Sequence, residues 1–220
     1  MPPFAVRDNT KKGKRKMYDY LIYDFDGTLS DTYPVFTEAF LKLLEKYDLP
    51  GDWDTVYGLL KQSVGAGLEH YDFPLSKKEA RAEFEKIYEL IALEKQQLFP
   101  EAEGILRLGM EKGKKNYVYT HSGLWVYSLM ERMGIRDCFD FILDCTYDFP
   151  RKPAPDALNF LIEKCGIDRS KALMIGDRDL DIEVAHNAGI DACLFDGENF
   201  YPDLQAEYKI SSLNELQQII

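Results

Sequence analysis

The sequence lacks any uninterrupted apolar stretch that approaches the length needed to span a membrane. A basic run, KKGKRK at residues 11–16, is not followed by the apolar segment that secretory signal peptides carry. We therefore expect neither a membrane partner nor a secretory signal.

Cysteines are few, and they show neither a C-x-x-C pair nor the spacing of zinc ligands. The four are Cys138, Cys145, Cys165 and Cys193. Cys165 and Cys193 lie in apolar patterns and are predicted to be core residues. We expect reduced thiols in a cytoplasmic protein.

Positive charge does not exceed negative charge, except near the start of the chain. Residues 1–17 hold six lysines and arginines against one aspartate, a net charge of +5. Because the 220-residue chain carries −11, residues 18–220 carry −16. This balance argues against nucleic-acid binding by the folded part, and any anionic substrate would need a cation beside it. Residues 1–17 are predicted to be a disordered basic leader.

What the sequence does contain is an alternation of apolar runs and amphipathic segments. Apolar runs typical of strands occupy 20–23, 116–120, 139–144, 171–177 and 190–195. Segments with helical spacing stand between them, at 101–113, 124–134, 153–166 and 179–189. Strands that alternate with helices form a parallel sheet, so we predict an α/β fold with a Rossmann-like parallel sheet and helices on both faces.

Residues 31–96 interrupt this alternation, because they contain helical patterns and no strand pattern. Helices are predicted over 34–47 and 76–95, the second opened by a capping box of Ser76 and Glu79. The segment 61–74 between them is predicted to be a loop that bends at Gly65 and Gly67. We expect a small helical cap over 31–96, inserted after the first strand of a core made of 18–30 and 97–220.

Four short segments lie at or just beyond predicted strand ends: DFDGT (24–28), YTHS (119–122), RKPAP (151–155) and GDRDLD (176–181). The carboxyl ends of parallel strands are where such sheets bind ligands. Together the segments supply the parts that phosphoryl transfer needs, namely a nucleophile, an acid/base, metal ligands and a positive charge. Aspartates this close would repel one another without a cation, and hard oxygen ligands favour Mg²⁺ over zinc.

These motifs, in this order, resemble those of the haloacid dehalogenase superfamily, and the resemblance covers nearly all of residues 18–220. The helical insertion is similar to the type-1 cap of the phosphoglycolate phosphatase and β-phosphoglucomutase branch. The stretch FPEAEGILRLGMEKGKKNYVYTHS (99–122) resembles the phosphatase group in particular.

The resemblance implies a role for each motif residue. Asp24 would be the nucleophile that forms an aspartyl phosphate, and Asp26 the general acid and then the general base. The other implied roles are a hydrogen bond from Thr120 to the phosphoryl group, charge neutralisation by Lys152, and Mg²⁺ ligation by Asp24, the Asp26 carbonyl, Asp177 and, as ligand or support, Asp181. His121 stands where many relatives have asparagine, so only its backbone N–H is a candidate donor to the phosphoryl group.

We therefore expect a Mg²⁺-dependent phosphatase that hydrolyses a small, phosphoglycolate-like phosphomonoester. A phosphomutase remains the alternative, since the cap contains Lys61, Lys77, Lys78 and Arg81. A receiver domain that holds a phosphoaspartate is a weaker alternative, because such domains are shorter and have no helical insertion. A dehalogenase is disfavoured because those enzymes lack the second aspartate.

The substrate itself stays open among phosphoglycolate, a sugar phosphate, a nucleotide and pyrophosphate. Lys61 and His70, in the predicted loop, are the candidate substrate contacts of the cap. The expected partner is a small phosphorylated metabolite, with neither nucleic acid nor membrane, bound by a monomer or homodimer.

Overall fold

The fold is built around one six-stranded sheet in which every neighbouring pair of strands is parallel. The computed structural model describes residues 16–220, so most of the predicted basic leader lies outside the described residues. The strand order is β5-β4-β1-β6-β7-β8. The strands are β1 (Tyr20–Tyr23), β4 (Lys115–Tyr119), β5 (Phe141–Leu143), β6 (Ala172–Gly176), β7 (Asp191–Phe195) and β8 (Tyr208–Ile210). The predicted parallel α/β fold is confirmed, with β8 as an additional edge strand.

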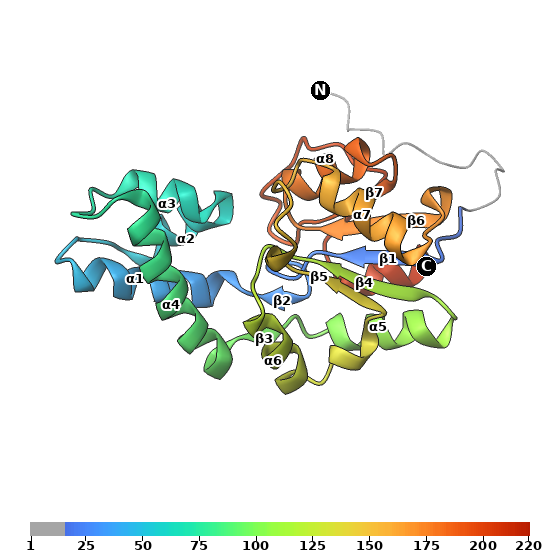
Figure 1. Ribbon diagram of the computed structural model, residues 1–220, viewed down its shortest axis with the longest axis horizontal. Helices are drawn as coiled ribbons and strands as arrows, with labels where there is room; N and C mark the ends of the chain where they lie inside the picture. Colours follow the sequence, from blue (N-terminus) through green and yellow to red (C-terminus); the bar gives the residue numbers. More distant parts are fainter. Residues whose placement is uncertain (1–15) are drawn as a thin grey trace, which may run out of the picture.

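Helices cover both faces of this sheet, because successive side chains of each strand point to opposite sides. From β1, Leu21 and Tyr23 join the core on one face, while Ile22 joins the core on the other. The first face is covered by α5 (Ala102–Glu111), α6 (Trp125–Arg132) and a 3-10 helix (Leu213–Gln218), the second by α7 (Asp156–Cys165) and α8 (Asp179–Asn187). Figure 1 shows α5 and α6 below the sheet and α7 and α8 above it.

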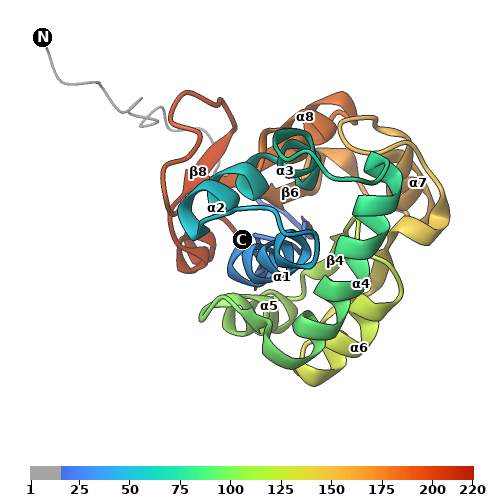
Figure 2. The same cartoon turned by 90° about the vertical axis from the view of Figure 1, so that its left-hand side faces the viewer.

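A helical unit is inserted between β1 and the rest of the sheet. Its two connections pair as a short antiparallel ribbon of β2 (Ser30–Asp31) and β3 (Gln97–Leu98). The helices are α1 (Tyr33–Lys46), α2 (Trp53–Gln62), α3 (Val64–His70) and α4 (Lys77–Lys95). They enclose a hydrophobic core of their own around Phe40, Leu44 and Phe84. Figure 2 looks onto this unit, with its helices in front of the sheet.

The prediction that 61–74 is a loop is wrong, because α2 extends to Gln62 and α3 occupies half of the segment. Ser63 caps α3 by accepting a hydrogen bond from the Ala66 amide at 2.9 Å. Gly67 does not serve as a bend: a Cβ there would lie 3.0 Å from the Phe40 ring, so the glycine lets α3 pack closely against α1. Gly67 thus serves close packing between helices.

Several local predictions can be compared directly with the structure. The capping box of Ser76 and Glu79 is confirmed at the start of α4. Cys193 is buried as predicted, whereas Cys165 is only half-buried. Within residues 16–220, no helix has both the length and the apolar character needed to cross a bilayer.

Candidate active site

The motif residues meet at the carboxyl edge of the sheet because their strands are neighbours. Asp24 follows β1, Thr120 follows β4, and Asp177 follows β6. β1 lies between β4 and β6, with Tyr23 opposite Val118 on one side and Ile175 on the other. The edge of a parallel sheet thus brings together residues that are about 150 positions apart in sequence.

Lys152, from the loop between β5 and α7, connects the acidic residues of this edge. Its ammonium donates to Asp24 Oδ1 at 2.6 Å, to Asp181 Oδ1 at 2.7 Å and to the Tyr119 carbonyl at 3.0 Å. A lysine ammonium has three N–H donors, so all three are occupied. The side chain is fully buried. Lys152 therefore fixes Asp24 and Asp181 in place.

Three buried carboxylates, those of Asp24, Asp177 and Asp181, form a group that could hold a cation. Each offers an oxygen, and these oxygens all lie within 4.8 Å of one another. Burial, with neighbouring carboxylates, raises the pKa of Asp24 to about 8 despite the opposing charge of Lys152. Burial likewise raises the pKa of Asp177 to about 6. Asp24 Oδ2 is buried and has no hydrogen-bond partner. A divalent cation with oxygen ligands would fit this group.

Two glycines allow these carboxylates to approach so closely. Gly27 has φ +86°, and a Cβ there would lie 2.4 Å from Asp177 Oδ2. A Cβ at Gly176 would lie 2.2 Å from the Cβ of Asp181. Any side chain at either position would push a carboxylate out of the group.

Asp26 lies apart from this group, and hydroxyl groups hold its side chain. Its carboxylate accepts hydrogen bonds from Ser122 Oγ at 2.7 Å, Thr32 Oγ1 at 3.1 Å, and both Thr120 Oγ1 and Tyr88 Oη at 3.4 Å. Tyr88 belongs to α4 and Thr32 directly precedes α1, so two of the donors come from the segment 31–96. These donors orient Asp26 toward the space between sheet and insertion.

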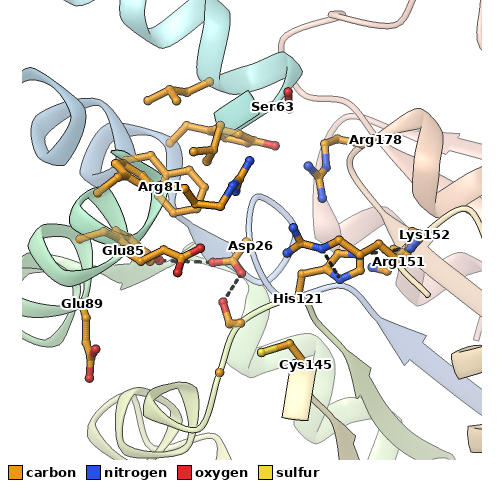
Figure 3. Close-up of a pocket in the computed structure, with 18 of the residues that line it drawn as sticks. Asp26, Ser63, Arg81, Glu85, Glu89, His121, Cys145, Arg151, Lys152 and Arg178 are labelled. Carbon is orange, nitrogen blue, oxygen red and sulfur yellow. Dashed lines mark hydrogen bonds between the residues drawn. The ribbon is translucent and has the colours of Figure 1, made fainter. Parts of the chain in front are cut away.

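That space is a cavity of about 450 Å³, with walls from both the sheet edge and the insertion. Its lining includes Asp26, His121, Ser122, Lys152 and Arg178 from the core, and Phe36, Arg81, Phe84, Glu85 and Tyr88 from the insertion. Figure 3 shows the guanidinium groups of Arg81, Arg151 and Arg178 pointing toward one another across it. The lining holds four cationic side chains, those of Arg81, Arg151, Lys152 and Arg178, against three carboxylates, those of Asp26, Glu85 and Glu89.

His121 lines the same cavity as a neutral side chain. Burial, followed by the charges of Lys152, Arg151 and Arg178, lowers the pKa of its imidazole to about 2. The Lys152 backbone N–H donates toward His121 Nε2 at 3.4 Å. An imidazole that stays neutral at ordinary pH supplies no charge for phosphate binding.

The comparisons with known proteins agree with this geometry. The model of the haloacid dehalogenase-like hydrolase family matches residues 21–195. The chain belongs to this family. A phosphoglycolate phosphatase of Nitrosococcus oceani is 26% identical over 219 residues, covering 93% of this chain and 97% of the relative.

Two further proteins are similar to this haloacid dehalogenase-like hydrolase. The fructose-1-phosphate phosphatase YqaB of Escherichia coli is 25% identical, and the match covers 80% of this chain and 95% of the YqaB chain. A haloacid dehalogenase-like protein of Streptococcus pneumoniae has the same fold, with a TM-score of 0.81 at 19% identity, covering 91% of this chain and 97% of that one. The chain is thus a hydrolase, and these curated relatives are named phosphatases.

The predicted cap contacts of the hydrolase, Lys61 and His70, do not line the cavity. Lys61 lies with its ammonium 3.3 Å from Glu198 in the loop after β7 and 4.4 Å from the centre of the Tyr33 ring. Tyr57 donates to the same Glu198 at 2.8 Å, so α2 is joined to that loop. His70 is exposed and packs against Tyr71.

Sequence reasoning missed Ser122, Tyr33 and Arg178. Ser122 stands two residues after Thr120, a spacing that could have indicated it, since the Ser122 amide also donates to Thr120 Oγ1 at 3.0 Å. Tyr33 opens α1 and donates to Asp177 Oδ2 at 2.5 Å, while Thr28 donates to Oδ1 at 3.2 Å. Nothing local to Tyr33 indicates that contact, because it joins residues 144 positions apart.

Tyr33→Phe is expected to weaken metal binding by about 10–100-fold, the usual cost of removing a hydrogen bond to a ligating carboxylate. The reason is that Asp177 would keep Thr28 but lose the donor that fixes Oδ2. Mn²⁺ titration followed by electron paramagnetic resonance measures this without substrate. Tyr57→Phe is the matched control, since that hydroxyl binds Glu198 instead. Equal Mn²⁺ affinity in wild type and Tyr33→Phe would contradict the expectation.

Proposed function

We propose that the protein is a Mg²⁺-dependent phosphatase that hydrolyses a small phosphomonoester through an aspartyl phosphate on Asp24. The observation that carries this proposal is the unpartnered, buried Asp24 Oδ2, whose sister oxygen is held by Lys152 beside the oriented Asp26. A carboxylate that has one oxygen held by a lysine and the other oxygen without a partner is suited to attack phosphorus. The family membership and the phosphatase names of the relatives support the same reaction.

In the first half-reaction, Asp24 Oδ2 forms a bond to phosphorus while the bond from phosphorus to the ester oxygen breaks. The proton for the departing alkoxide comes from Asp26, which acts as the general acid. Its four hydroxyl neighbours hold the carboxyl in position for this transfer. The products of this step are the free alcohol and the aspartyl phosphate.

In the second half-reaction, Asp26 removes a proton from a water molecule, which attacks phosphorus and releases Asp24 as a carboxylate. Asp26 is then protonated again and ready for the next substrate. Lys152 keeps Asp24 in one orientation throughout, because its three donors stay bound. The reaction consumes one water and gives inorganic phosphate.

The metal would be held by Asp24 and Asp177, with the Asp26 carbonyl as a further ligand and Asp181 as ligand or support. Asp181 fits support well, since Oδ1 accepts from Lys152 and Oδ2 from the Arg178 amide at 3.1 Å. When bound, Mg²⁺ would neutralise the carboxylates and the charge on the phosphoryl oxygens.

For the substrate, we propose a phosphoglycolate-like compound as the first candidate. The Nitrosococcus oceani relative carries that activity in its name. Arg81 and Arg151 line the cavity, and they suit a second anionic group such as a carboxylate. Arg81 comes from α4, so the insertion would take part in substrate choice.

Hydrolysis of an aryl phosphate is expected to require Mg²⁺ and to fall to background in excess chelator. The physical reason is that the acidic group, with the pKa of Asp24 raised to about 8, neither ionises fully nor accepts a phosphate without a cation. Release of nitrophenolate measures the rate, and returning Mg²⁺ should restore it. Full activity in chelator would contradict the proposal.

A phosphomutase is the second candidate, favoured by the same arginines, which could hold a second phosphate. The two activities differ in their products. With a sugar phosphate, phosphorus nuclear magnetic resonance distinguishes inorganic phosphate from an isomerised sugar phosphate. We expect inorganic phosphate.

A further inference from the structure

We infer that Arg178 is a catalytic residue whose guanidinium binds the phosphoryl group being transferred. The inference rests on the proposed function and adds a substrate contact to it. Arg178 follows Asp177 directly and precedes the first residue of α8. Figure 3 shows its guanidinium pointing into the cavity, toward those of Arg81 and Arg151.

The first reason is that Arg178 Nε is a buried donor with no hydrogen-bond partner. Within residues 16–220 the guanidinium has neither a side-chain hydrogen bond nor an ion pair with a carboxylate. A buried donor without an acceptor is costly, so native proteins leave few of them, often at functional sites. The terminal nitrogens of the same guanidinium point into the cavity, where they can donate to a phosphoryl oxygen.

The second reason is that Lys152 has no free donor for the substrate. Its three N–H groups are taken by Asp24, Asp181 and the Tyr119 carbonyl. Lys152 therefore acts on the phosphoryl group by charge alone while it holds Asp24. A charged hydrogen-bond donor to the phosphoryl group would therefore have to be another side chain that faces the same place.

The third reason is the position of Arg178. It directly follows Asp177, and its backbone N–H donates to Asp181 Oδ2 at 3.1 Å, so it lies beside the acidic group. An arginine side chain keeps its charge at any ordinary pH. Arg81, in contrast, belongs to α4 of the insertion, and Arg151 Nε donates to His121 Nδ1 at 3.5 Å. Of the three arginines, Arg178 is therefore the one held next to Asp177 and Asp181.

The test is Arg178→Gln, which keeps a polar side chain but removes the charge and the forked donor. We expect kcat/KM for an aryl phosphate to fall by about 10²–10³, as when a donor to a transition-state oxygen is removed. Binding of inorganic phosphate in the presence of Mg²⁺, measured by calorimetry, is expected to weaken at least about tenfold. Arg136→Gln, outside the cavity, is the matched control.

A purely structural role would give a different pattern. If Arg178 only neutralised the carboxylates, its removal would tighten Mn²⁺ binding and leave phosphate affinity unchanged, and that result overturns the inference. Arg178→Lys keeps the charge without the fork, and we expect it to bind phosphate more weakly than wild type but more tightly than Arg178→Gln. If Arg178→Gln does not fold, wild-type phosphate affinity in Arg178→Lys overturns the inference. Calorimetry needs no turnover, so a wild type that binds phosphate but hydrolyses no ester would refute the proposed function separately.

Discussion

Asp24→Asn is expected to abolish turnover, with a loss on the order of 10⁶-fold, as found when a covalent nucleophile is removed. An amide oxygen cannot form the acyl phosphate, and the unpartnered atom that carries the proposal would lose its charge. The fold should survive, because Lys152 keeps Asp181 and the Tyr119 carbonyl. Nitrophenyl phosphate hydrolysis and thermal unfolding measure the two effects.

The matched control for this substitution is Asp203→Asn, which makes the same change at an exposed position. It should retain wild-type kinetics. Substantial turnover by a folded Asp24→Asn protein would show that another residue is the nucleophile, or that water attacks the ester directly.

Asp26→Asn is expected to separate the two half-reactions. With an alkyl phosphate both steps need Asp26, and each should slow by about 10²–10⁴-fold. With nitrophenyl phosphate the leaving group needs little protonation, so only the attack of water should stall. An asparagine can still accept the Ser122 hydrogen bond and keep the backbone carbonyl for the metal, so the site should remain assembled.

A phosphoenzyme should therefore accumulate in Asp26→Asn, seen as a burst of nitrophenolate followed by little further release. Mass spectrometry of the digested protein should find one phosphoryl group on the peptide that contains Asp24. A label on another residue, or wild-type turnover by a folded variant, would refute the roles assigned to Asp24 and Asp26.

The sheet, and the edge of it where the motif residues lie, could be predicted from the sequence because their signals are local. The run YLIY is apolar and buried on both faces, and the two aspartates follow it within three residues. Once strands and helices alternate, the parallel arrangement brings the strand ends together. The short β8 carries no such signal, since its three residues become a strand only by pairing with β7.

The contacts that complete the site could not be predicted, because they depend on tertiary packing. Tyr33 reaches Asp177 only because α1 starts beside the sheet edge. From the sequence, Arg178 can be recognised only as a loop residue, because its place in the cavity depends on how the insertion packs against the core. The segment with Gly65 and Gly67 has the composition of a loop, yet Gly67 is needed where α3 meets Phe40. Composition cannot distinguish a glycine at which the chain bends from a glycine that lets two helices pack closely.

The central position of β1 also determines the order in which the chain can fold during synthesis. Its two partners are β4 and β6, and β6 ends at Gly176, about 150 residues after Tyr23. A ribosome adding about 5–20 residues per second leaves this apolar strand without its second neighbour for about 8–30 s. The helices α1–α4, which have a core of their own, emerge within that interval and can pack first. Of the six strands of this sheet, β1 therefore waits longest for both of its neighbours.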